Sequence, residues 1–246
     1  MNAPSKLYCR HRFPAEIISH CVWLYFRFCL SYRDVEEMMA QRGVIVTYES
    51  IRAWCQKVGQ TFANKLRRQR PHPGEKWHLD EVFLEIRGKT YYLWRVVDQD
   101  GNVLDVLVQS RRNKAAAKRF FRKLLKRLRY VPRVIVTDKL KSYGAAKKDS
   151  LRNVEHRQHK GLNNRAENSH QPTRERARRL RRFKSAAHAQ RFLSVYGPIC
   201  CHFGPGRHLL SAQDYRQQMS QRFESWRELT SLRGLGRRSP ATAVTA

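Results

Sequence analysis

The stretch EKWHLDEVFLEIRGKTYYLWRVVDQDG, residues 75 to 101, opens a run of strand-forming residues with two acids, Asp80 and Glu81. A strand rich in Val, Phe, Ile and Tyr should bury at least one face, and a buried carboxylate is costly unless it is paired or holds a metal. Strands are predicted over residues 78–86, 91–97 and 103–109, and the Asp100-Gly101 pair is a hairpin signal. We therefore expect an antiparallel meander whose first strand carries the carboxylates.

The elements that follow indicate how this sheet continues. Residues 113–130 form an amphipathic helix, RVIVTD (133–138) is a short apolar strand that ends on Asp138, and NVEHRQHK (153–160) is a further strand. This order places the middle of the first strand beside the end of the fourth, which would bring Asp80 and Asp138 together. Two adjacent carboxylates repel each other, so the pair is stable mainly with a divalent cation, and oxygen ligands select Mg²⁺ or Mn²⁺.

A third carboxylate would complete such a site. Glu167 lies in the first turn of a helix predicted within GLNNRAEN, although a helix N-terminus favours an acid without any metal. Glu155, on an alternating strand, and Glu175, within a basic stretch, compete for the role. Glu81 either supports the site or faces the other side of the sheet. Three acids around the hairpin are interpreted as turn or surface residues: Asp98, Asp100 and Asp105.

Three helices are predicted before the sheet. After a first apolar-periodic segment, Ser31 opens a capping box and Thr47 opens the helix TYESIRAWCQKVGQTF. One face of this last helix is apolar, while Ser50, Arg52 and Gln56 lie near the other. Two short helices joined by a Gly-containing turn are typical of a helix-turn-helix. A plain helical bundle has the same periodicity, but the charge of the chain favours DNA reading by this polar surface.

The charge of the chain points to a polyanionic partner. Fifty Lys and Arg against twenty Asp and Glu give a net charge of +30, which favours nucleic acid. Residues 111–133 hold eleven basic residues and no acid, and residues 174–184 hold seven. We expect these clusters, with Lys123 and Arg127 in the first, to contact phosphates without reading sequence. A basic binding protein without chemistry would share the charge, but it would rarely have such an aromatic core.

Composition divides the chain into four predicted parts. Residues 1–64 form the helix-turn-helix domain, residues 65–76 a linker containing Pro and Gly, residues 77–195 the catalytic domain, and residues 196–246 a helical extension with a disordered tail. The most apolar segment, residues 17–30, is too short and too polar to span a bilayer. No signal peptide precedes it. We therefore expect a cytoplasmic protein.

Several motifs together resemble the IS6 family of insertion-sequence transposases. They are FPAEII, LSYRDVEEMMAQRG, WHLDEVFLEIRG, YLWRVVDQDGNVLDVLV, VIVTDKLKSYGAA, EHRQHKGLNNRAEN and RRFKS. The resemblance implies an α/β fold: an RNase H-like catalytic domain, with a mixed five-stranded sheet and flanking helices, behind an all-α helix-turn-helix domain. It also implies a DDE triad of Asp80, Asp138 and Glu167 that binds two Mg²⁺ ions, and a basic residue, Arg174, that holds DNA. Pro172 should interrupt the helix between Glu167 and Arg174.

The resemblance further implies a function. We expect a DNA transposase that recognises terminal inverted repeats, nicks 3′ ends and joins them to target DNA, replicatively and with cointegrate formation. It would act as a homodimer or a larger synaptic complex in the nucleoid of a prokaryote. An RNase H-like structure-specific nuclease or resolvase would use the same acids. A helix-turn-helix regulator with a degenerate nuclease domain is the non-enzymatic alternative.

Overall fold

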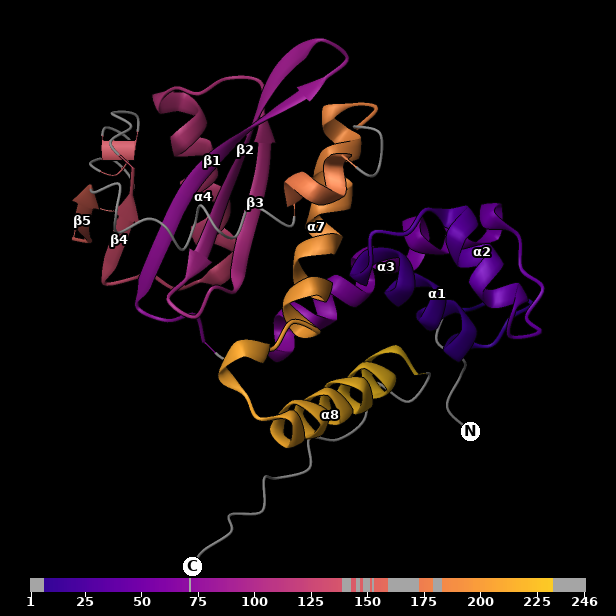
Figure 1. Cartoon of the computed structure of the whole chain (residues 1–246). Coiled ribbons are helices and arrows are strands. Elements are labelled where there is room, and N and C mark those ends of the chain that lie inside the picture. The colour runs from indigo at the N-terminus through magenta and orange to yellow at the C-terminus, as the bar shows by residue number, and fades with distance from the viewer. Residues whose placement is uncertain are drawn as a thin grey trace, which may run out of the picture.

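The computed structural model describes residues 7–70, 72–138, 143–144, 147, 151, 153–158, 173–178 and 183–231, and the structural statements below concern these residues. Figure 1 shows a twisted sheet at one end of the molecule and a group of helices at the other. The helix α7 (Ala186–His202) runs between them and contacts both the sheet and the N-terminal helices. The predicted residues Glu167 and Pro172, and the C-terminal tail, lie outside the described residues.

The sheet has five strands in the order β3-β2-β1-β4-β5. They are β1 (Lys76–Ile86), β2 (Lys89–Asp98), β3 (Val103–Gln109), β4 (Val134–Thr137) and β5 (Glu155–Gln158). The first three form an antiparallel meander, β4 pairs parallel with β1, and β5 pairs parallel with β4. A crossover helix, α4 (Lys114–Leu128), connects β3 to β4. This mixed five-stranded sheet is that of an RNase H-like fold, so the predicted fold class is confirmed.

The three N-terminal helices form as predicted, with α1 (Ala15–Arg27), α2 (Tyr32–Ala40) and α3 (Tyr48–Gln69). Ser31 and Asp34 make the reciprocal bonds of a capping box, and the Thr47 side chain accepts from the Ser50 amide. α3 continues to Gln69, beyond the predicted helix of residues 47–62 and into the predicted linker of residues 65–76. Its apolar stripe extends to the buried Leu66, and the helix ends only where the chain approaches Pro71.

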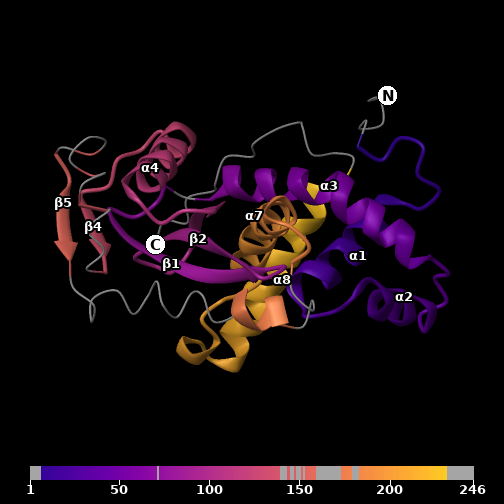
Figure 2. The ribbon, with the colours of Figure 1, turned by 90° about the horizontal axis from the view of Figure 1, so that it is seen from above.

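The two faces of the sheet belong to two hydrophobic clusters. Alternate side chains of β1 point to opposite faces, so Trp77 and Leu79 pack with the aromatic side chains of α4 while Val82 and Leu84 pack on the other face. That second cluster also contains the buried residues of α7 and of the N-terminal helices. The buried residues of α4 belong to the first cluster and those of α7 to the second, so the two helices cover opposite faces of the sheet. Figure 2 shows α7 between the strands and α1. The helical group and the sheet therefore share one core.

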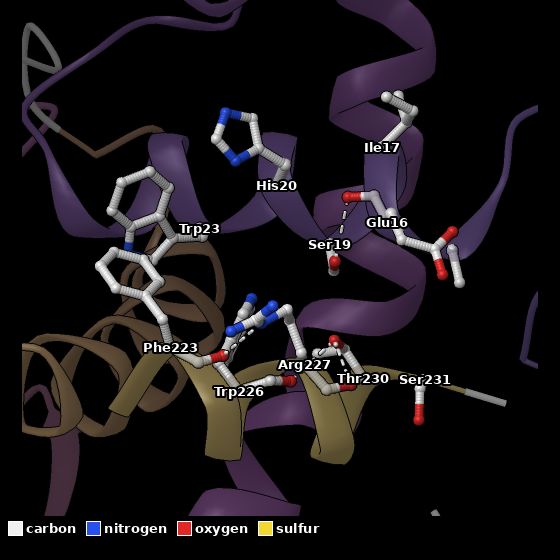
Figure 3. Close-up of a pocket in the computed structure, with 11 residues that line it drawn as sticks. Glu16, Ile17, Ser19, His20, Trp23, Phe223, Trp226, Arg227, Thr230 and Ser231 are labelled. Atoms are coloured by element: carbon white, nitrogen blue, oxygen red, sulfur yellow. Dashed lines mark hydrogen bonds between the residues drawn. The ribbon is translucent and has the colours of Figure 1, made fainter. Parts of the chain in front are cut away.

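The described part of the C-terminal extension, residues 196–231, is largely helical and belongs to the same core. α7 runs across the predicted boundary after residue 195, and the short 3-10 turn Arg207–Leu209 leads to α8 (Ala212–Thr230). Trp226 and Leu229 of α8 are buried. Residues of α1 and α8 line a pocket of about 410 Å³, and the rings of Trp23 and Phe223 make an edge contact with 5.2 Å between their centroids. Figure 3 shows these side chains facing one another across the pocket. In the described part of the chain, no helix is both long and apolar enough to cross a membrane.

Candidate active site

The pairing of β1 with β4 positions a cluster of carboxylates. Leu79 is the register partner of Thr137, so the next residue along each parallel strand, Asp80 and Asp138, leaves the paired region at the same level. Glu81 follows directly on β1. Carboxylate oxygens of Asp80, Glu81 and Asp138 all lie within 4.8 Å of one another. The structure thus brings together the two aspartates that the strand order predicted, and adds a glutamate to them.

Glu81 is the most deeply buried member of this cluster. The Tyr143 hydroxyl donates to its Oε2 at 2.8 Å, and Arg112 Nε lies 2.8 Å from its Oε1. The Arg112 contact is an ion pair whose N–H direction does not meet hydrogen-bond geometry. Burial, reinforced by the charges of Asp138 and Asp80, raises the pKa of Glu81 to about 7, although the Tyr143 bond and Arg112 oppose the shift. Three acids this close need a compensating cation.

The backbone at Asp138 is held by its neighbours. The buried Thr137 Oγ1 lies 2.8 Å from the Asp138 carbonyl oxygen and 2.9 Å from His156 Nε2. A hydroxyl has one proton, so Thr137 donates to the carbonyl and accepts from a His156 ring protonated at Nε2. Burial and the nearby Lys147 lower the pKa of His156, which favours the neutral imidazole. β5 therefore braces the strand end that carries Asp138.

The competing acids lie away from this cluster. Glu155 is the register partner of Val134, at the opposite end of β4 from Asp138, and its exposed carboxylate pairs with Arg157 at 2.6 Å. Val134 and Asp138 are four residues apart along the strand, which is about 13 Å. Glu175 is exposed within residues 173–178. The predicted third ligand, Glu167, stays a prediction because it lies outside the described residues.

The residues predicted to contact DNA occupy different surroundings. Arg52 and Gln56 are exposed on α3, and Arg174 is exposed, whereas Ser50 is half-buried and bonds Thr47 in the helix cap. Their roles in DNA binding stay predictions.

Lys123 and Arg127 lie against an acid of the sheet. Their side-chain nitrogens are 2.9 and 2.7 Å from Asp105 Oδ1, and both side chains are about one third exposed. Asp105 itself is only 3% exposed, so its interpretation as a turn or surface acid is wrong. The helix α4 covers it, which the strand pattern alone did not indicate. Asp98 does serve the turn, accepting from the amides of Asp100 and Asn102.

Sequence reasoning missed the groups that support the carboxylates. Arg112, Tyr143 and His156 come from three separate segments that meet only in the folded sheet. The adjacency of Asp80 and Glu81 in the sequence was an indication that both could belong to one site. Because neighbouring strand residues point to opposite faces, however, it argued for separation rather than for a shared cluster.

The RNase H-like sheet, with acids in the middle of β1 and directly after β4, and a matching family model together define the class of the protein as a DDE domain. A family model described as a DDE domain, of the IS240 transposase type, matches residues 74–203, more than half of the chain. The chain belongs to the IS6 family of DDE transposases.

Curated relatives agree with this assignment. A transposase for the insertion sequence-like element IS431mec of Staphylococcus aureus is 28% identical over 210 residues, which cover 78% of this chain and 93% of the relative. A transposase for IS257 in transposon Tn4003, from the same species, has the same identity and coverage. An uncharacterized protein of Yersinia pseudotuberculosis, pYV0051, is 38% identical over 72 residues, 28% of this chain and 67% of the relative.

Solved structures with a partial likeness are retroviral integrases. The catalytic core of HTLV-2 integrase in complex with magnesium, in its dimeric form, is 17% identical, with a TM-score of 0.31, and the match covers 37% of this chain and 63% of that one. The catalytic core of BIV integrase is 14% identical, with a TM-score of 0.37, covering 49% of this chain and 82% of that one.

Proposed function

We propose that this transposase binds the terminal inverted repeats of its element, nicks the 3′ ends and joins each freed 3′-OH to target DNA. The observation that carries the proposal is the cluster of Asp80 and Glu81 in the middle of β1 with Asp138 directly after β4, within 4.8 Å of one another. It belongs to a chain with a net charge of +30, which suits a DNA substrate. No nucleotide cofactor is implied, because one phosphodiester is exchanged for another.

The donor set suits divalent cations with a preference for oxygen. Asp80 and Asp138 would hold two Mg²⁺ or Mn²⁺ ions, with Glu167 as the third ligand. The mutual repulsion of three close carboxylates supports this assignment, because a bound cation would offset it. When bound, such ions activate an attacking oxygen and stabilise a leaving oxygen in phosphodiester exchange.

The side chains of the protein keep this geometry fixed. β1 and β4 place Asp80 and Asp138 at one level, while Thr137 and His156 hold the Asp138 backbone. Preorganised ligands reduce the reorganisation needed when the scissile phosphate arrives. Tyr143 and Arg112 fix the direction of the Glu81 carboxylate in the same way.

Recognition of the element ends is assigned to the helix-turn-helix surface of α3, with Ser50, Arg52 and Gln56. Arg174 is assigned to the phosphates beside the metals. The enzyme would work as a homodimer or larger synaptic complex and transpose replicatively through a cointegrate.

The test is a nicking and joining assay on DNA that carries an element end, with Mg²⁺. Asp80→Asn and Asp138→Asn should each abolish both products while binding to the end stays nearly intact. Glu155→Gln is the matched control, since it removes a carboxylate at the far end of β4. Nicking without any joined product would favour a structure-specific nuclease, and end binding without nicking by the wild type would favour a regulator.

A further inference from the structure

A basic groove lies where the end of α3 meets the C-terminal end of α4. Its volume is about 610 Å³, and the residues that define it are Arg67, Arg68, Arg70, His72, Leu104 and Arg127. No acid is among the described residues that line it. The groove is distinct from the carboxylate cluster, because Leu104 belongs to the edge strand β3, two strands from β1. That is on the order of 10 Å across the sheet.

Among the described residues, two of its arginines are held in place by neutral acceptors and by no acid. Arg67 Nη1 donates to Asn64 Oδ1 at 3.0 Å and its Nη2 to the Ser194 carbonyl, while Arg70 Nη1 donates to the Val103 carbonyl at 2.7 Å. Arg67 Nε and Arg70 Nη2 are buried with no acceptor among the described residues. A buried N–H without an acceptor is unusual and calls for a water or an anion.

The charges around the groove are unbalanced. Asp105 is the acid whose charge acts on Arg67, and its Oδ1 already contacts Lys123 and Arg127. Burial, and the like charges of Arg127 and Arg70, lower the pKa of Arg67 to about 9 despite the attraction of Asp105. Because its surroundings destabilise the charged form of this guanidinium group, a bound anion would stabilise that form strongly.

We propose that this groove binds the phosphate backbone of duplex DNA, at phosphates other than the scissile one at the carboxylate cluster. The inference rests on the proposed function for its substrate and adds a second contact surface to it. Arginine forks suit phosphate oxygens, and the volume exceeds that needed for a single phosphate group. His72 is the one aromatic ring among the described lining residues, so the groove offers little on which unpaired bases could stack.

The test is a salt titration of DNA binding by the full chain without divalent metal, so that no nicking occurs. Arg68→Gln is the informative variant, because Arg68 is exposed and its loss should leave the fold intact. It should lower the magnitude of the slope of log K against log salt by about 0.9, and Arg68→Gln/Arg70→Gln by about 1.8. Arg216→Gln removes an exposed arginine of α8 and should leave the slope unchanged.

An unchanged slope in folded Arg68→Gln protein would overturn the proposal. A second arm measures the melting temperature with inorganic phosphate alone. If phosphate stabilised the wild type but not the double variant while the DNA slope stayed the same, the groove would be a free-anion site and the DNA assignment would be wrong. Failure of the proposed function is separable from these outcomes, because it appears as absent nicking and joining and not as a change of slope.

Discussion

The position of the Glu81 carboxylate depends on tertiary packing and does not follow from the strand pattern alone. On a strand, neighbours point to opposite faces, yet Glu81 and Asp80 reach the same cluster. The longer glutamate side chain is anchored by Tyr143, a buried residue of the α4 face, which holds its carboxylate near those of Asp80 and Asp138. Glu81 thus belongs to the carboxylate cluster that we propose as the metal site.

A substitution at Glu81 therefore tests the site without touching either aspartate. Glu81→Gln keeps an acceptor for Tyr143 but removes one negative charge, and it should weaken Mn²⁺ affinity about 10–100-fold. Isothermal titration of the full chain measures this directly. Glu85→Gln is the control, since Glu85 is an exposed acid on the same strand. Equal Mn²⁺ affinity of the wild type and the Glu81→Gln variant would show that Glu81 does not contribute to metal binding.

At the scale of elements, α4 is attached to the sheet by charge as well as by its apolar face. Lys123 and Arg127 share Asp105 Oδ1, while Phe120, Phe121 and Leu124 are buried in the cluster on that face. Burial and the like charges of Arg127 and Arg67 lower the pKa of Lys123, although Asp105 opposes this. Both cations keep contact with solvent, which reduces the strength of each pair.

Asp105→Asn should accordingly destabilise the fold by about 1–3 kcal/mol, between the values of surface and buried ion pairs. Urea unfolding followed by circular dichroism gives the free energy. Asp100→Asn, in the exposed hairpin turn, should change it by less than about 0.5 kcal/mol. A cost for Asp105→Asn no larger than that of the control would mean that α4 is held by its apolar face alone.

The elements that the sequence predicted are those with local causes. The capping box at Ser31, the hairpin at Asp100-Gly101 and the apolar stripe of α4 each depend on residues close together in the sequence, and all three are present. The burial of Asp105 and the contacts of Arg112 depend on which helix covers which face, so no local pattern contains them. The meeting of Asp80 with Asp138 lies between these cases, because strand order alone predicts it.

At the scale of the whole molecule, the helices that carry the predicted end-reading surface pack against later parts of the chain and do not form a separate unit. Phe62 of α3 contacts Trp226 of α8, and Lys65 donates to the Leu229 carbonyl. Arg176, 1% exposed, donates to the Tyr25 and Leu30 carbonyls and so ties residues 173–178 to α1. A surface on α3 is therefore best tested by substitutions within the full chain rather than in a fragment of residues 1–64.

Arg52→Ala/Gln56→Ala should reduce the preference for an element end over random duplex. Each lost base contact should cost about 1–3 kcal/mol of discrimination. The salt slope on random duplex should change little, because phosphate contacts set it. Competition binding on both DNAs measures the two quantities together, and loss of affinity for both DNAs alike would move end recognition away from α3.

The central claim is that Asp80 and Asp138 hold the divalent metal for phosphodiester exchange. Crystals of the protein soaked in Mn²⁺, with diffraction data collected at the manganese edge, test it most directly. The account predicts anomalous density between the two carboxylates, at a coordinating distance of about 2.0–2.2 Å from an oxygen of each. Anomalous density at another position would contradict the claim. So would the absence of density in crystals soaked at a Mn²⁺ concentration that saturates binding in solution.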